Sequence, residues 1–411
     1  MNPDDLFLFP RQWMDDESRS VSDLVRQWAE KEILSKRMDY RENYGKLFLD
    51  KRKQLNLTIG LQRLTLPTTH GGFGWNSPAN APGVLTIVSE IGRADAAMGV
   101  SSAIKYVIFA TITMGHTLNR KLCDALAPLY TADEIKTPTL ILPGAGFVGQ
   151  DTPLYKGRSI LARAQSVKSG YVISGKTLRP LVAGARADMF CVVCAGKKDK
   201  PCIAFIPGDA PGVKRGKTFK TTGLNALENA DVTFSDVEIG KEFLIDRDGV
   251  VEELFTWLNL LLSGVSLGAG INSYEIFRDW SENRVIKGGG LLKENPLCAS
   301  VLADAADEIA TARLLLYNLA HLISKPDEWG QVSLLHLFTY AEMIGCRVQQ
   351  GILRAINRGM ELMGSAGYSK EWHVEKHWRD VKTIGSLLSG VGAEGPVRMD
   401  TSRFFNACTE I

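Results

Sequence analysis

The spacing of apolar residues changes twice along the chain, and this order of patterns limits the folds that it can adopt. Up to about residue 130 the spacing is helical, as over residues 85–94. Short strand-like runs follow, such as 160–167 and 171–174, which flank the turn signal Ser169-Gly170. We therefore predict an N-terminal helical domain over residues 1–133 and a middle antiparallel β domain over residues 134–247.

From about residue 248 the helical spacing returns. Helices are predicted over residues 334–347 and 351–363, and a long apolar stripe precedes them. The stripe consists of Leu302, Ala305, Ile309, Ala312, Leu316 and Leu319. A C-terminal helical domain over residues 248–411 completes an α+β multidomain chain. The apolar run 258–271 is interrupted by polar and glycine residues, so we interpret it as a buried core helix and not as a membrane span.

Composition excludes several functional classes. The chain has 411 residues and a formal net charge of +2, so no broad basic surface for nucleic acid is expected. The N-terminal segment is acidic and lacks the pattern of a signal peptide, and the seven cysteines are scattered. These features predict a cytoplasmic protein without a nucleic-acid partner.

No metal site is predicted. Cys191 and Cys194 have the spacing of a ligand pair, but they lie in a predicted strand, where residues three apart face opposite sides. His373 and His377 have helical metal spacing, and a structural surface role is the favoured interpretation for them.

The strongest motif lies near the C-terminus. Residues 360–368 read MELMGSAGY and residues 374–380 read VEKHWRD. Together they resemble the "QIxGGxGY … VExxxRD" signature of acyl-CoA dehydrogenases. Further matches in the same order are LPTTHGGFG over 66–74, VSEIGRADA over 88–96 and PGAG over 143–146.

The resemblance implies a fold and a chemistry. The fold has an N-terminal helical domain, a middle antiparallel β-barrel and a C-terminal four-helix bundle. Its members bind FAD and oxidise an acyl thioester: a carboxylate takes the α-proton while the flavin takes the β-hydride. The implied partners are a thioester on coenzyme A or an acyl-carrier protein and an electron-transfer flavoprotein, within a homo- or hetero-oligomer that has no membrane span.

The carboxylate is missing from both positions at which this family carries it. The alignment places Ser389 at the usual loop position and Leu258 at the alternative helical position. A serine needs an activating partner to act as a base near pH 7. Glu394, in the same glycine-rich loop, is a candidate displaced base; the alternative is that it is solvated or caps a helix.

The residues implied in cofactor binding also depart from the family. On the flavin-ring side they are Leu140, Ile141, Pro180 and Val182, where the resemblance would place polar and aromatic residues. On the pyrophosphate side, which in family dimers serves the neighbouring subunit, they are Arg284, Asn295, Glu361, Gly364 and Ser365. Arginine bonds phosphate well, and glycine allows close backbone approach.

Three functions follow from the resemblance. The first is an FAD-dependent acyl-thioester dehydrogenase with a displaced or missing base. The second is the non-catalytic subunit of a hetero-oligomeric acyl-CoA dehydrogenase. The third is a repurposed member that binds an acyl thioester without oxidising it.

Overall fold

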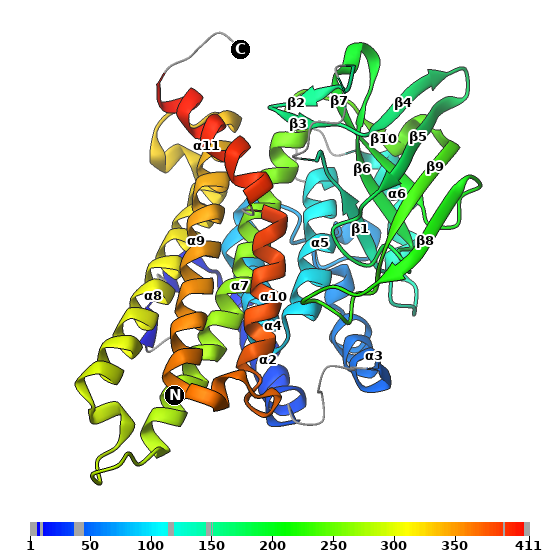
Figure 1. The fold of residues 1–411 in the computed structure, drawn as a ribbon. Coiled ribbons are helices and arrows are strands. Elements are labelled where there is room, and N and C mark those ends of the chain that lie inside the picture. Colours follow the sequence, from blue (N-terminus) through cyan, green and yellow to red (C-terminus); the bar gives the residue numbers. More distant parts are fainter. Residues whose placement is uncertain are drawn as a thin grey trace.

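The computed structural model describes residues 6–8, 11–36, 45–113, 119–144, 149, 151–388 and 391–406. Helices, strands and helices follow one another in the predicted order (Figure 1). The N-terminal helices are α2 (Asp16–Glu32), α3 (Gly45–Lys53), α4 (Ala81–Ala94), α5 (Ala96–Thr113) and α6 (Arg120–Thr131). The C-terminal helices are α7 (Val250–Asn283), α8 (Pro296–Ser324), α9 (Leu334–Met363), α10 (Val374–Leu388) and α11 (Val391–Phe405).

The strands lie between these two helical groups. They are β1 (Pro138–Ile141), β2 (Leu154–Tyr155), β3 (Arg158–Ser159), β4 (Ala162–Val167), β5 (Gly170–Leu178), β6 (Met189–Ala195), β7 (Pro201–Pro207), β8 (Val213–Phe219), β9 (Asn229–Gly240) and β10 (Leu244–Ile245). The predicted three-part fold class is confirmed, whereas the exact domain boundaries stay predictions.

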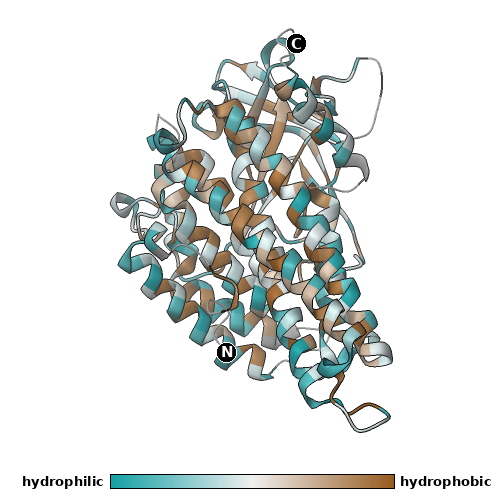
Figure 2. Cartoon of the chain, turned by 90° about the vertical axis from the view of Figure 1, so that its left-hand side faces the viewer, coloured by the Kyte–Doolittle hydropathy of each residue, from teal (hydrophilic) through white to brown (hydrophobic). Residues whose placement is uncertain are grey.

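The central element is α7, a helix of 34 residues. It packs against α4, α5, α8, α9 and α10, and the whole segment 258–271 is buried, as predicted. A helix that is apolar on all sides needs neighbours on all sides, which explains its place inside the molecule. Among the described helices, α7 is the one long and apolar enough to cross a membrane, and its apolar window is entirely covered by protein. In the hydropathy view, the teal hydrophilic segments are frequent along the outer helices (Figure 2).

Close approach of α4 and α7 depends on a glycine. A Cβ at Gly268 would lie 1.9 Å from the backbone oxygen of Ser89 and 2.5 Å from the backbone nitrogen of Arg93. These are backbone atoms that a rotamer change cannot move, so no other residue fits there without shifting a helix.

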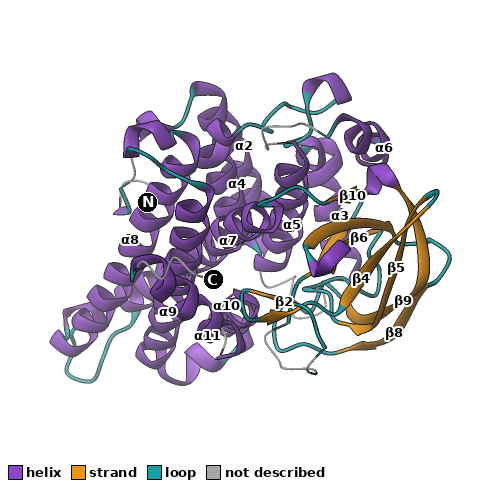
Figure 3. Ribbon diagram, turned by 90° about the horizontal axis from the view of Figure 1, so that it is seen from above, coloured by secondary structure: helices purple, strands orange, loops and turns teal. Residues whose placement is uncertain are grey.

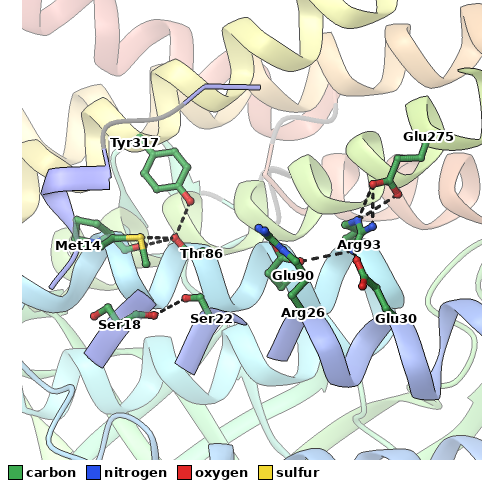
Figure 4. A network of polar contacts seen from close by, with 11 residues as sticks. Met14, Ser18, Ser22, Arg26, Glu30, Thr86, Glu90, Arg93, Glu275 and Tyr317 are labelled. Carbon is green, nitrogen blue, oxygen red and sulfur yellow. Dashed lines mark hydrogen bonds and ion pairs between the residues drawn. The ribbon is translucent and has the colours of Figure 1, made fainter. Parts of the chain in front are cut away.

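Polar contacts join α2, α4, α7 and α8 around this crossing (Figure 4). Arg93 of α4 bonds both carboxylate oxygens of Glu275 of α7, at 3.0 and 3.1 Å. Arg26 of α2 bonds Glu90 of α4 at 2.6 Å. A further hydrogen bond of 2.6 Å joins the hydroxyls of Thr86 and Tyr317. Pairing of this kind is what makes buried charge tolerable between helices.

The middle domain is built on one sheet, seen beside the helices in Figure 3. Within the described residues it has eight strands in the order β10-β7-β6-β4-β5-β9-β8, with β1 pairing β6 off this path. The predicted hairpin of β4 and β5 is present, but β1 and β4 both run parallel to β6. The sheet is therefore mixed, and its path is not closed into the barrel that the resemblance implies.

The VEKHWRD segment holds the middle domain against the bundle. Asp380 Oδ1 accepts a hydrogen bond of 2.6 Å from the backbone N–H of Leu224, and its Oδ2 accepts one of 2.5 Å from Lys376. Arg379 donates to the carbonyl of Thr222 at 2.9 Å. Through these two residues α10 is bonded to the loop before β9.

Candidate functional site

A cavity of about 220 Å³ lies where the middle sheet meets the C-terminal helices. Its walls come from the segments after β1 and β5, from β3, α7, α9 and α11, and from the end of α10. Complete ligand sites are larger, roughly 300–1,000 Å³. The cavity therefore accounts for the reacting end of a ligand and not for a whole dinucleotide.

The two segments predicted on the flavin-ring side lie side by side here. The backbone N–H of Leu181 donates to the carbonyl of Leu140 at 2.9 Å, and the hydroxyl of Thr139 donates to the carbonyl of Val182 at 2.5 Å. Ile141 and Val182 are buried, and so is Pro180. Leu142, Pro143 and Gly144 line the cavity from the first segment, and Arg179 and Leu181 line it from the second, so its wall on this side is apolar apart from Arg179.

Residues next to the two customary carboxylate positions line this cavity. Leu258 is fully buried in the core, and its neighbour Asn259 lines the cavity. Ser389 lies outside the described residues, but Leu388, directly before it, lines the cavity. Asn259 and Leu388, which are far apart in the sequence, thus line the same cavity.

Glu394 lies in the first turn of α11, where it pairs with Arg398 one turn further along the helix. It is not among the described residues that line the cavity. Its assignment as a displaced base stays a prediction.

A buried ion network borders the cavity. Arg158 of β3 donates a hydrogen bond of 2.5 Å to Glu342 Oε1 on α9 and one of 2.9 Å to Asp400 Oδ2 on α11. The side chains of all three are at most 6% exposed. The guanidinium also lies 5.4 Å from the centre of the Phe255 ring. Sequence reasoning missed this network, since Arg158 and Glu342 are far apart in the chain.

The sequence does hold one signal for Glu342. On α9 it occupies the buried face together with Phe338, Gly345 and Gln349, at helical spacing. A lone carboxylate within an apolar stripe either pairs with a cation or serves a site.

The residues predicted for the pyrophosphate side lie elsewhere. Arg284 is exposed directly after α7, with its guanidinium 5.6 Å from the Trp280 ring. Asn295 caps α8 by accepting from two backbone N–H groups. Glu361 bonds Asn357 and Arg358 on its own helix.

Open backbone lies at the end of α9. Gly364 has a φ of 61°, and a Cβ there would meet nothing within 4 Å. Ser365 beside it is exposed.

These two groups of residues lie toward opposite ends of α7. Asn259 is in its first third, whereas Arg284 follows its last residue. At 1.5 Å per residue the separation is roughly 40 Å, more than one dinucleotide reaches. One chain therefore does not bring both groups to the same cofactor.

The remaining sequence candidates have structural surroundings. Cys191 and Cys194 are buried in β6, and burial raises the pKa of both thiols far above their ordinary value. His373 and His377 are both buried, so the surface role expected for them is wrong; His377 Nε2 lies 3.0 Å from Asn272 Oδ1. No group of three or more metal-ligating side chains occurs in the part of the chain that the structure describes.

Comparison with known proteins agrees with the motifs. The family described as "Acyl-CoA dehydrogenase, C-terminal domain" matches residues 260–388. The short/branched chain specific acyl-CoA dehydrogenase of Bos taurus is 23% identical over 394 residues, covering 93% of this chain and 84% of that protein. Residues 260–388 thus match the acyl-CoA dehydrogenase family, and the low identity to relatives over most of the chain fits a divergent member.

Solved structures show the same family fold. Butyryl-CoA dehydrogenase from Megasphaera elsdenii superimposes with a TM-score of 0.76 at 18% identity, covering 95% of this chain and 99% of that one. The FAD complex of PigA has a TM-score of 0.75 at 14% identity, covering 96% and 98%. At these identities the likeness establishes the acyl-CoA dehydrogenase fold, and the chemistry has to be argued from the site.

Proposed function

We propose that this protein is an FAD-dependent acyl-thioester dehydrogenase that works as an oligomer. The observation that supports this most is that four segments line one cavity: the two ring-side segments, and the residues Asn259 and Leu388 next to the customary carboxylate positions. A bound FAD would supply the hydride acceptor for the β-carbon of the thioester.

The residues present are compatible with this cofactor. Exposed Arg284 and Lys287 offer cations for a pyrophosphate, and Gly364 offers open backbone beside which a phosphate has room. At the other end, Leu142 and Leu181 give apolar walls for a ring system and Phe255 an aromatic one. Because one chain does not unite these two ends, a second chain has to complete each site.

Three further proposals concern the substrate carrier, the electron acceptor and the compartment. The thioester is carried by coenzyme A or an acyl-carrier protein, and an electron-transfer flavoprotein takes the electrons. The protein works in the cytoplasm. None of these proposals depends on which carboxylate takes the proton.

The flavin content of the protein expressed alone tests the proposal. We expect close to one FAD per chain and bleaching of the flavin absorbance when an acyl-CoA is added without oxygen. A flavin-loaded protein that no acyl thioester of any chain length reduces would contradict it.

A second candidate is the non-catalytic subunit of a hetero-oligomeric dehydrogenase. Arg284 and Gly364 on the pyrophosphate side favour this role. In it, these residues of this chain would bind the pyrophosphate of an FAD whose ring lies in the partner chain. FAD that is bound only after co-expression with a homologous chain would support it. A colourless homo-oligomer that still binds acyl-CoA would support the repurposed, non-oxidative member instead.

A further inference from the structure

Glu342 is the one carboxylate among the described residues that line the cavity. It lies in the first third of α9, lines the cavity together with Phe255 and Asn259 of α7, and is 2% exposed. The family carries its catalytic acid either directly after Leu388 or at the position of Leu258. This chain has no acid at either position. A carboxylate on a third element reaches the same cavity.

Among the described residues, Arg158 donates to one oxygen of Glu342 and no donor reaches the other, while the Asp400 carboxyl lies near enough to share a proton with Glu342. Oε1 accepts the 2.5 Å hydrogen bond from Arg158. Oε2 is buried and has no hydrogen-bond partner among the described residues. An unsatisfied buried oxygen is costly in a folded protein, and it occurs preferentially where a ligand or a proton supplies the missing partner.

Asp400 completes the arrangement. It accepts the 2.9 Å hydrogen bond from the other end of the Arg158 guanidinium. The nearby Asp400 carboxylate disfavours the charged form of Glu342 and so adds to the rise of its pKa.

We propose that Glu342 is the proton acceptor of this site, at a third position for the carboxylate in this fold. The inference rests on the proposed function. Glu342 accepts the α-proton of the thioester, and the electron pair of that C–H bond forms the α,β double bond. A bound FAD would take the β-hydrogen together with its two electrons, so the thioester would be oxidised and the flavin reduced. Arg158 acts as a positioning residue for this carboxylate.

The electrostatic surroundings fit this role. Burial is the main cause that raises the pKa of Glu342 to about 8; Arg158 opposes the rise, and Asp400 adds to it. A base with such a pKa is deprotonated only in part at neutral pH. We therefore expect the rate of flavin reduction to increase as the pH rises through about 8.

Three variants test the assignment on the FAD-loaded, full-length protein. Glu342→Gln removes the base with little change of shape. Glu90→Gln is the matched control, because Glu90 is also buried and bonded to an arginine, but it lies at the contact of α2 and α4 away from the cavity. Glu394→Gln tests the competing carboxylate.

With an acyl-CoA that reduces the wild type, we expect Glu342→Gln to slow flavin reduction roughly 10²–10⁴-fold, as for loss of a general base. Its FAD content should be unchanged. Glu90→Gln should reduce as the wild type does. A wild-type rate in folded Glu342→Gln, or a comparable loss in Glu394→Gln alone, would overturn the inference.

Two measurements keep the test decisive. If Glu342→Gln does not fold, Glu342→Asp keeps the charge and moves the carboxylate by one methylene, and an unchanged rate and pH profile there would overturn the inference. The infrared carbonyl band of a protonated carboxyl, read without substrate, should titrate near pH 8 in the wild type and be lost in Glu342→Gln. The same titrating band in the variant would assign the proton elsewhere.

A flavin-loaded wild type that no thioester reduces would overturn the proposed function, and the inference with it.

Discussion

At the scale of single residues, the fold places a charged residue, Glu342, on the buried face of α9, where the sequence pattern predicts an apolar helix core. Glu342 is surrounded by charged and titratable groups from several elements. Arg158 and Lys156 come from the β2–β3 hairpin, Asp400 comes from α11, and Cys346 lies one turn along α9. Removing one member of such a group leaves an uncompensated buried charge, which costs about 3–5 kcal/mol.

The raised pKa of Glu342 makes stability depend on pH. Its ordinary pKa is 4.5 and its pKa in the folded protein is about 8, so between these values the folded state binds more protons than the unfolded state. Stability contributed by protonated Glu342 is therefore present below about pH 4.5 and is lost as the pH rises through about 8.

Urea denaturation at pH 5 and at pH 8.5 measures this effect. The free energy of unfolding of the wild type should fall more between these two pH values than that of Glu342→Gln, whose side chain stays neutral. Parallel pH profiles for the two proteins would show that Glu342 does not carry this proton.

At the scale of elements, the sequence predicted which segments are helices or strands better than it predicted which strands pair with each other. The stripe from Leu302 to Leu319 lies in α8 as expected, and the predicted β4–β5 hairpin is present. The two helices predicted over 334–347 and 351–363 are one helix, α9, because Gly351 sits inside it without breaking it. The parallel pairing of β1 with β6 joins strands with no local signal between them, so periodicity alone could not predict it.

The crossing of α4 and α7 gives a prediction at the same scale. Gly268→Ala would push a methyl group against the backbone of Ser89 and Arg93. Overpacking of this kind costs about 1–3 kcal/mol, so the thermal midpoint should fall by several degrees. The same substitution at Gly395 in α11, where a Cβ meets nothing within 4 Å, should leave the midpoint unchanged or raise it slightly. Equal effects at the two positions would speak against the tight crossing.

The candidate site could be predicted only in part. The residues that form it are far apart in the sequence, so no local pattern links them. The resemblance named Leu258 and Ser389 as vacant carboxylate positions, and Asn259 and Leu388 beside them line one cavity. The replacement carboxylate on α9 has no sequence motif, because its partner Arg158 lies in a different domain. Only the folded chain brings them together.

At the scale of the whole molecule, the separation of the two cofactor ends along α7 predicts dependence on assembly. Arg284→Ala should weaken FAD binding about 10–100-fold, since a hydrogen bond to a charged group contributes about 1.5–3 kcal/mol. Flavin titration of the apoprotein measures this, with Arg186→Ala, an exposed arginine of the middle domain, as the control. Diluting the protein until the oligomer dissociates should release FAD from the wild type as well. Retention of FAD by an isolated monomer would show that one chain suffices.

The Arg158–Glu342–Asp400 network has a consequence for protein engineering. Its members belong to the middle domain and to two helices of the C-terminal bundle, although the chain otherwise reads as separable modules. A chimera that grafts the bundle of this protein onto a middle domain that lacks an arginine at the position of Arg158 would bury two acids without their arginine. Recombination between such paralogues should therefore succeed only where the β2–β3 hairpin is inherited together with α9 and α11.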